Sequence, residues 1–279
     1  MTLLHTSRGD FESIIEGPEG APLVVLLHGF PELNVSWRHQ IPALVDAGYR
    51  VLAPNQRGYS GSVRDGSYAT KDLAKDVVAM VDALDAQRAV IVGHDWGGGV
   101  AWTVAHFFPE RVDRLIALNC PPPVVLAHEI ATNPAQLLKS WYMFFFQLPV
   151  LPERFLSTHM PGPLVGGSYN RKAWTAESLA PYEAAFATPA DAKGAVNWYR
   201  GALRHPARNA PKISLPILII WGVQDQFLSL GMLSPQSLRR ALAFGNEPTV
   251  VLVEEAGHFV QNEAPEQVTA AMLNWLGPA

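Results

Sequence analysis

The sequence predicts an α/β protein with a doubly wound, mostly parallel central sheet flanked by helices. Short apolar runs rich in β-branched residues recur along the 279-residue chain, as is typical of strands buried on both faces of a parallel sheet. Segments with helical periodicity alternate with these runs, and this alternation indicates the α/β class. The alternation stops between residues 121 and 210, which predicts an insertion into the sheet.

The candidate strands are short and lack charged side chains in their central positions. They are residues 22–28, 49–53, 89–92, 115–118, 217–221 and 249–253. The first of them, PLVVLLH, is apolar up to its final histidine. We expect each to be buried on both faces, because an alternation of apolar and polar residues is missing.

The candidate helices lie between these strands and are bounded by start and stop signals. They are residues 37–47, 70–84, 97–108, 235–243 and 265–276. Gly48 and Pro109 end two of them, and Thr70 is a candidate N-cap. A chain of this length can build one large core without metal or disulfide staples.

The insertion is rich in proline and in aromatic residues. Twelve of the chain's 27 Phe, Trp and Tyr residues fall within it. An aromatic, mostly helical segment that interrupts a sheet is typical of a cap over an apolar pocket. We therefore expect a core domain of residues 1–120 and 211–279 and a helical cap domain of residues 121–210. A helical decoration without function is the alternative.

Composition excludes several classes of function. Lys and Arg number 21 against 25 Asp and Glu, a formal charge of −4, which argues against nucleic-acid partners and polybasic membrane patches. The single cysteine, Cys120, cannot form an intrachain disulfide, and no histidine spacing matches a metal site. The first ten residues lack the basic start and long apolar run of a signal peptide, and no stretch approaches 18 uninterrupted apolar residues. We expect a cytoplasmic protein without membrane insertion and without a bound metal.

Residues 93–97 (GHDWG) carry the most specific motif of the chain. They follow the candidate strand 89–92 and open the candidate helix 97–108, which is the strand–turn–helix context of a nucleophile elbow. The glycines permit the sharp turn that exposes one side chain above the sheet edge. That side chain belongs to Asp95. An incidental glycine-rich turn is the alternative.

An aspartate at this position selects the reaction. Serine occupies the nucleophile position in esterases, whereas a carboxylate is suited to displacing a leaving group from an sp³ carbon, which gives an aspartyl ester. Epoxides and alkyl halides are substrates of that kind. Water must then hydrolyse the ester, and this step needs a base and donors for the developing oxyanion.

The base and its partner follow in the expected order along the chain. His258 follows the last candidate strand, and Asp225 follows the strand 217–221. The order nucleophile, acid, base matches the elbow motif. We expect Asp225 to accept the imidazole N–H of His258 and to fix its tautomer. Asn119 stands after the preceding strand, so the acid does not lie there. A surface histidine and a helix-capping aspartate are the alternatives.

The oxyanion donors are expected at two backbone positions. Residues 28–32 (HGFPE) end the first central strand and form a loop that faces the elbow. The backbone N–H groups of Phe30 and Trp96 are therefore the predicted oxyanion hole. A glycine-containing loop at residues 57–62 (RGYSGS) is assigned to structure, with Arg57 pairing to nearby carbonyl or carboxylate groups.

With these motifs, the chain resembles the α/β-hydrolase superfamily and, within it, the soluble epoxide hydrolases. The resemblance runs from about residue 22 to residue 275. It implies an α/β-hydrolase fold with a helical cap, or lid, inserted in the sheet. Two cap segments make it specific, namely residues 141–147 (WYMFFFQ) and 197–200 (NWYR).

The resemblance assigns Tyr142 and Tyr199 as the paired tyrosines that assist ring opening. An opening epoxide develops a basic alkoxide that needs an acid, and a phenol can supply the proton. The implied function is hydrolysis of a hydrophobic epoxide to a vicinal diol, through a covalent ester on Asp95 and water activated by His258. The reaction needs no cofactor. The implied partners are the epoxide and water, and the chain is expected to be a monomer or a homodimer.

Two other functions stay open at this point. Haloalkane dehalogenases share the aspartate, the histidine and Trp96, but they use a polar side chain where this chain has Phe30. Fluoroacetate dehalogenases carry arginines next to the nucleophile, where this chain has Trp96 and Gly99. A non-catalytic small-molecule receptor on the same scaffold is the third hypothesis, and an intact triad with both tyrosines argues against it.

Overall fold

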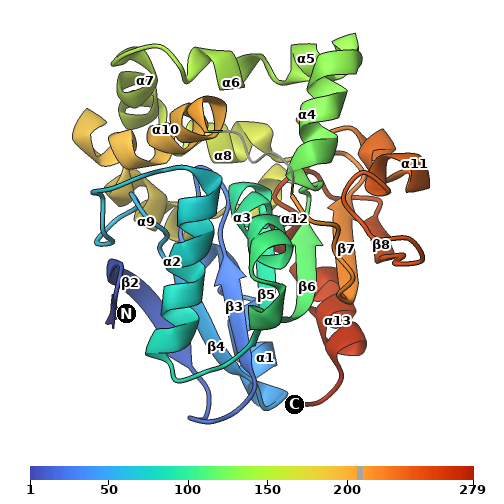
Figure 1. Cartoon of the computed structure of the whole chain (residues 1–279). Coiled ribbons are helices and arrows are strands. Elements are labelled where there is room, and N and C mark those ends of the chain that lie inside the picture. The colour runs from blue at the N-terminus through green and yellow to red at the C-terminus, as the bar shows by residue number, and fades with distance from the viewer. Residues whose placement is uncertain (206–209) are drawn as a thin grey trace.

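The computed structural model describes residues 1–205 and 210–279 and confirms the α/β architecture (Figure 1). Residues 206–209, near the end of the predicted cap, lie outside the described residues. In the described part of the chain, one eight-stranded sheet has the order β1-β2-β4-β3-β5-β6-β7-β8. The strands are β1 (Thr2–Thr6), β2 (Gly9–Glu16), β3 (Leu23–Leu27), β4 (Arg50–Pro54), β5 (Ala89–His94), β6 (Val112–Leu118), β7 (Ile217–Gly222) and β8 (Thr249–Val253).

All six predicted strands are present as β3 to β8, and they pair in parallel. Strands β1 and β2 were not predicted; they pair antiparallel with each other, and β2 joins β4 at one edge of the sheet. Their polar and apolar residues are mixed because this edge hairpin is exposed on one side. The expectation of two-sided burial is wrong for β8. It is the opposite edge strand, and Val250 and Leu252 are exposed there.

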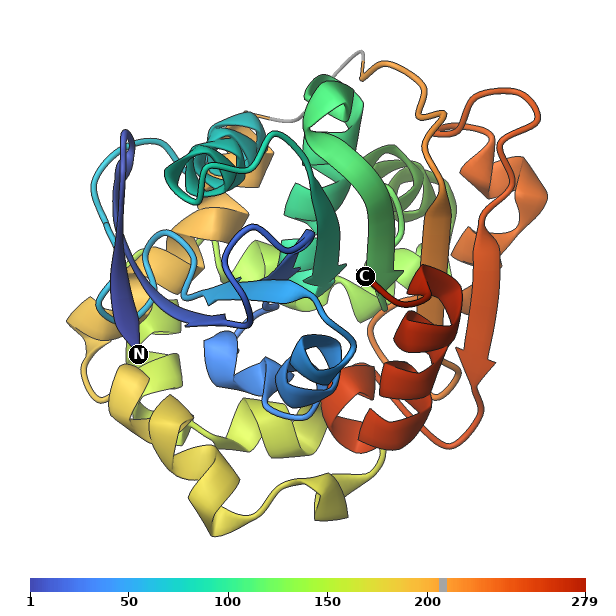
Figure 2. The same cartoon turned by 90° about the horizontal axis from the view of Figure 1, so that it is seen from below.

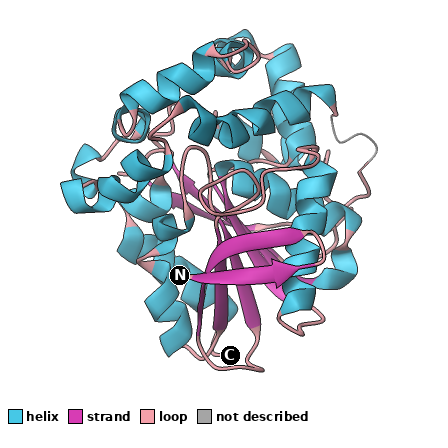
Figure 3. Cartoon of the chain, turned by 90° about the vertical axis from the view of Figure 1, so that its left-hand side faces the viewer, coloured by secondary structure: helices cyan, strands magenta, loops and turns pink. Residues whose placement is uncertain are grey.

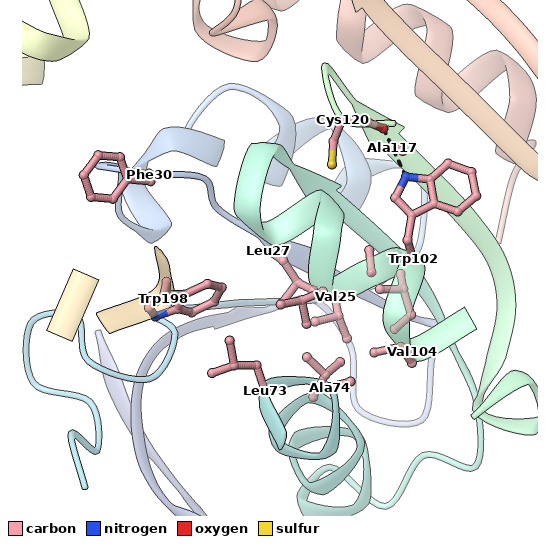
Figure 4. Close-up of a cluster of buried hydrophobic side chains, with 14 of the residues drawn as sticks. Val25, Leu27, Phe30, Leu73, Ala74, Trp102, Val104, Ala117, Cys120 and Trp198 are labelled. Atoms are coloured by element: carbon pink, nitrogen blue, oxygen red, sulfur yellow. Dashed lines mark hydrogen bonds between the residues drawn. The ribbon is translucent and has the colours of Figure 1, made fainter. Parts of the chain in front are cut away.

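Helices cover both faces of the sheet (Figure 2). Helices α2 (Thr70–Ala83) and α3 (Asp95–Phe107) pack on one face, and α1 (Gln40–Asp46) and α13 (Pro265–Leu276) pack on the other. Side chains of β3 alternate between the two cores, with Val25 facing one and Val24 the other. Figure 4 shows Val25 and Leu27 beside Leu73 and Ala74 of α2 in the first core.

Several predicted helix boundaries are wrong. Ala69, rather than Thr70, is the N-cap of α2, and no side chain caps that helix. Of the helix predicted at 37–47, only Gln40–Asp46 form α1, and Trp37 ends a separate 3₁₀ turn at Asn34–Trp37. The helix predicted at 235–243 is only α11 (Pro235–Leu238). The predicted start of α3 was two residues late, because Asp95 itself opens the helix.

The described part of the segment between β6 and β7 is mostly helical and lies over the carboxyl ends of the strands (Figures 1 and 3). It contains α4 (Pro123–Thr132), α5 (Pro134–Lys139), α6 (Trp141–Phe145), α7 (Leu151–His159), α8 (Gly162–Gly167), α9 (Ala176–Ala185) and α10 (Pro189–Arg204). Trp198 Nε1 donates to the Arg57 carbonyl at 2.8 Å, and the hydroxyls of Tyr182 and Ser36 lie 2.8 Å apart. These buried bonds hold the segment against the sheet domain. None of the described helices is long and apolar enough to span a membrane.

Arg57 has the structural role predicted for it. Its guanidinium donates to both carboxylate oxygens of Asp76 on α2, at 2.6 and 2.9 Å, and also to the carbonyl of Asp65. Both side chains of this pair are 4% exposed. Removing one partner of a buried pair leaves the other charge uncompensated.

Replacing Asp76 with Asn should therefore destabilise the protein without affecting its chemistry. We expect the free energy of unfolding to fall by about 3 kcal/mol, the scale for breaking a buried ion pair. Denaturant unfolding followed by circular dichroism measures this change. A loss below about 0.5 kcal/mol, the size of an ordinary surface effect, would contradict the assigned role of the pair.

Candidate active site

The strand–turn–helix elbow is formed as predicted. Strand β5 ends at His94, and α3 begins at Asp95, which has a positive φ of 48°. This backbone conformation is uncommon for residues other than glycine and is typical of functional sites. A Cβ atom on Gly93 would overlap the backbone of Gly97, and one on Gly97 would overlap the backbone of Leu27. Both glycines are thus required for the close packing that presents Asp95.

The Asp95 carboxylate lies between a backbone donor and an imidazole. The Phe30 N–H donates to Oδ1 at 2.9 Å, and Nε2 of His258 lies 3.4 Å from Oδ2. Burial alone would raise the pKa of Asp95, but the hydrogen bond and charge of His258, the charge of His94 and the Phe30 N–H together lower it. Asp95 is therefore ionised, as the predicted nucleophile must be.

The predicted acid and base are in contact. Nδ1 of His258 lies 2.8 Å from Oδ2 of Asp225. Burial opposes the imidazolium form, but the charges and hydrogen bonds of Asp225 and Asp95 raise the pKa of His258 well above its usual value. His258 is therefore protonated in the resting protein. Its Nδ1–H is held by Asp225, and its Nε2 side faces Asp95.

Asp225 accepts hydrogen bonds from three donors besides His258, and none of these three was predicted from the sequence. Its carboxylate accepts from the backbone N–H groups of Phe227 and Leu228, at 2.8 and 3.0 Å. It also accepts from Nδ2 of Asn119 at 2.8 Å. From the sequence, Asn119 was interpreted only as evidence that the acid does not follow β6. Its position at the end of β6, beside β7, was the available signal that it lies next to Asp225.

A hydrogen bond to Asp95 is present for only one of the two predicted oxyanion donors, Phe30 and Trp96. The Phe30 N–H already points at the Asp95 carboxylate. Trp96 is the second residue of α3, where the backbone N–H has no partner within the helix. The assignment of both groups to an oxyanion hole stays a prediction.

The two tyrosines lie together over this site. The Tyr199 ring of α10 is 4.9 Å from the rings of both Phe30 and Trp96, the neighbours of Asp95. The Tyr142 ring of α6 is 6.0 Å from that of Tyr199 and 5.6 Å from that of Phe227, which in turn contacts the His258 ring at 5.0 Å. These contacts bring residues from two separate insertion helices to one place.

Both phenols are neutral and able to donate. Burial, followed by the charge of Asp95, raises the pKa of Tyr142 far above its ordinary value. Burial, Tyr142 and Asp95 do the same for Tyr199. The Tyr142 hydroxyl makes no hydrogen bond to any other described residue, so its proton is available to a ligand. Among the described residues, no group of three or more His, Cys, Asp or Glu side chains could hold a metal ion.

Comparison with known proteins identifies the family. The model of the alpha/beta hydrolase fold family matches residues 22–265. The chain belongs to this family. The α/β-hydrolase fold predicted from the resemblance is therefore confirmed, and the protein is a hydrolase.

The relatives of this α/β-hydrolase confirm the resemblance to epoxide hydrolases. It is 35% identical over 318 residues to epoxide hydrolase A of Mycobacterium tuberculosis, covering 98% of this chain and 96% of that protein. It is 37% identical over 267 residues to the AB hydrolase superfamily protein YfhM of Bacillus subtilis, covering 93% and 92%. The crystal structure of epoxide hydrolase A from Mycobacterium thermoresistibile matches with a TM-score of 0.82 and 32% identity, covering 99% and 97%.

Proposed function

We propose that this hydrolase converts hydrophobic epoxides to vicinal diols through a covalent ester on Asp95. The observation that carries the proposal is the pair of neutral phenols, Tyr142 and Tyr199, beside an ionised aspartate at the nucleophile elbow. An ester or an alkyl halide does not need two such acids, whereas a strained ether oxygen does. The names of the relatives support the same substrate class.

In the first step, one carboxylate oxygen of Asp95 attacks a ring carbon, and the bond from that carbon to the epoxide oxygen breaks. The electron pair of this bond moves to the oxygen, which takes a proton from Tyr142 or Tyr199. Phe30 holds Oδ1 of the nucleophile by its N–H, which orients the carboxylate. The product of the step is a β-hydroxyalkyl ester of Asp95.

In the second step, His258 activates water. Esterification removes the negative charge of Asp95, one of the influences that raise the pKa of His258. The pKa of His258 therefore falls when the ester forms. The imidazolium gives its proton, through solvent, to the phenolate that ring opening left, and the neutral imidazole becomes a base. Water attacks the aspartyl carbonyl while His258 takes its proton. The N–H groups of Phe30 and Trp96 stabilise the oxyanion. The bond from the aspartyl carbon to the substrate oxygen then breaks, that oxygen takes the second proton of the water and leaves as the diol, and the Asp95 carboxylate forms again beside a protonated His258.

We propose that the insertion, residues 121–210, acts as a cap that supplies the tyrosines and encloses the substrate. Its side chains next to the phenols are mostly aromatic. Phe146 stacks on Tyr199 with ring centroids 4.6 Å apart, and Phe227 of the core domain contacts Tyr142. Apolar walls of this kind suit an epoxide with an aryl or alkyl substituent.

A substrate panel tests the proposal against the dehalogenase and the receptor hypotheses. Terminal, trans and aryl epoxides and bromoalkanes are incubated with the protein, and diol and bromide release are both measured. We expect diol release, with bromide release negligible beside it, because Phe30 offers a departing halide no side-chain donor. Comparable bromide release would favour a dehalogenase, and binding without turnover would favour a receptor.

Removing the phenolic hydroxyls should slow ring opening. Tyr142→Phe and Tyr199→Phe should each lower the rate of ester formation by about 10²-fold, the usual scale of general acid catalysis, and the double variant should be nearly inactive. Stopped-flow or quenched single-turnover measurements give this rate. Tyr169→Phe is the matched control, because Tyr169 is an exposed tyrosine of the insertion. Unchanged rates in both single variants would refute the assignment.

A further inference from the structure

Gln136, on helix α5 of the insertion, forms a buried polar link to the acid loop, residues 225–229, which carries Asp225. Gln136 is completely buried. Its Nε2 donates to the Phe227 carbonyl at 2.8 Å. Its Oε1 accepts from the backbone N–H and from the hydroxyl of Ser229, at 3.1 and 2.7 Å. The proposed reaction steps assign no role to this residue.

All the hydrogen-bonding capacity of the Gln136 amide is used. A glutamine amide has two N–H donors and two acceptor lone pairs. The second N–H donates to Oγ of Ser140, a residue of the insertion, at 3.1 Å. With the amide turned over, its nitrogen would face the Ser229 N–H and its oxygen would face the Phe227 carbonyl, so neither of these two bonds could form. The network therefore fixes a single orientation of the side chain.

The peptide unit between Phe227 and Leu228 is held from both sides. This peptide is trans, so its carbonyl and its N–H point in opposite directions. The carbonyl accepts from Gln136. The N–H, which belongs to Leu228, donates to Oδ1 of Asp225 at 3.0 Å. Because a rotation of the unit would break both bonds, Gln136 keeps this N–H directed at the acid.

The two carboxylate oxygens of Asp225 have different partners. Oδ1 accepts from the N–H groups of Phe227 and Leu228 in the acid loop. Oδ2 accepts from Nδ2 of Asn119 and lies beside Nδ1 of His258, each at 2.8 Å. The acid loop therefore sets the rotation of the carboxylate that orients the imidazole. A shift of this loop would turn the carboxylate away from His258.

The same glutamine lies close to the helix that carries one of the phenols. Ser140 separates α5 from α6, and Tyr142 is the second residue of α6. The Tyr142 ring is 5.6 Å from the ring of Phe227, which contacts the His258 ring at 5.0 Å. Gln136 is thus placed where the insertion meets the acid and the base.

We propose that Gln136 is a positioning residue, through which the insertion keeps Asp225 and His258 in the geometry that ester hydrolysis requires. None of its hydrogen bonds goes to a reacting group, so it acts through the peptide unit that it holds. The effect on turnover rests on the proposed function, whereas the effect on the contact between Asp225 and His258 does not. Ester formation uses Asp95 and the phenols, so the loss of the Gln136 amide should affect the second step alone.

Single-turnover kinetics with an epoxide tests the proposal. Gln136→Met keeps the length of the side chain but removes the amide. It should slow ester hydrolysis by about 10²-fold, the scale of a small misplacement of reacting groups, while ester formation keeps its wild-type rate. The ester on Asp95 should therefore accumulate during turnover, which intact mass measures, and kcat/KM should fall far less than kcat. A role confined to stability would slow both steps alike or neither.

Two variants are controls for Gln136→Met. Asp76→Asn breaks a buried ion pair away from the site, so it should destabilise the protein while both steps keep their rates. Ser140→Ala removes the hydroxyl that bonds the same amide on the side of the insertion, and it should accumulate no ester.

A milder variant decides the question if Gln136→Met does not fold. Ser229→Ala removes the hydroxyl that bonds the amide on the side of the acid loop. It should slow ester hydrolysis by about 5-fold, the scale of one lost hydrogen bond, and ester should accumulate. Equal rates of ester hydrolysis in Ser229→Ala and Ser140→Ala would overturn the inference.

Proton NMR without substrate separates this inference from the proposed function. The proton between Nδ1 of His258 and Asp225 should give a downfield resonance in the wild type, identified by its absence in His258→Gln. In Gln136→Met this resonance should broaden or disappear, because a loosened carboxylate lets the proton exchange with water. If the wild type hydrolyses no epoxide, the proposed function is wrong, and the resonance still decides whether Gln136 controls the contact. An unchanged resonance, or an active Gln136→Met that accumulates no ester, would overturn the inference.

Discussion

His258→Gln should accumulate a stable adduct on Asp95 when mixed with an epoxide. Ester formation needs the carboxylate and the phenols, whereas ester hydrolysis needs the imidazole to activate water. The variant should therefore complete the first step and stop, and its steady-state turnover should fall by at least about 10³-fold. Intact mass should rise by the mass of one substrate, and peptide mapping should locate the increase on Asp95.

His106→Gln is the matched control for this variant. His106 is also a buried histidine, but it lies at the far end of α3, where its Nδ1 is 2.6 Å from the Pro211 carbonyl. It should turn over normally without an adduct. A His258→Gln variant that stays folded and shows no mass increase would contradict a covalent first step, and would favour direct attack of water on the epoxide.

Asp95→Ala should abolish epoxide hydrolysis, with a loss of at least about 10⁴-fold, because no other described carboxylate takes its place above the elbow. The tyrosines and His258 are kept in this variant, so substrate binding should persist. Turnover and binding are measured by diol release and by calorimetry. In a double variant that combines Asp95→Ala with His258→Gln, the covalent adduct expected for His258→Gln alone should not form.

Asp113→Ala is the control, since Asp113 is a half-exposed aspartate that pairs with Arg88 on the surface. It should match the wild type in both assays. Residual turnover in Asp95→Ala within about 10-fold of the wild type would contradict the assignment of the nucleophile.

Local patterns in the sequence were sufficient to predict that Asp95, Asp225 and His258 lie together. The elbow at 93–97, His258 and Asp225 each follow an apolar strand of a parallel sheet, so the strand order alone brings them to one edge. The structure brings Tyr142 and Tyr199 together from α6 and α10. No periodicity links these two positions, and only the resemblance to a family connected them.

Other features depend on contacts that no local pattern reveals. Gln136 is 91 residues from Phe227 and 93 from Ser229 in sequence, and a glutamine in a helical insertion gives no sign of either partner. The β1–β2 hairpin was missed because an exposed edge mixes polar with apolar residues. Conversely, β8 is apolar like a central strand, yet it forms an edge. Strand position in the sheet is a property of the whole fold.

A single turnover in ¹⁸O water, with the wild-type protein in excess over the epoxide, tests the central claim most directly. If Asp95 is the nucleophile, water attacks the aspartyl carbonyl, so one ¹⁸O atom enters the Asp95 carboxylate and the first diol released contains none. Mass spectrometry of the peptide that contains Asp95, and of the diol, measures both. A labelled diol from the first turnover, with an unlabelled Asp95, would contradict the covalent mechanism.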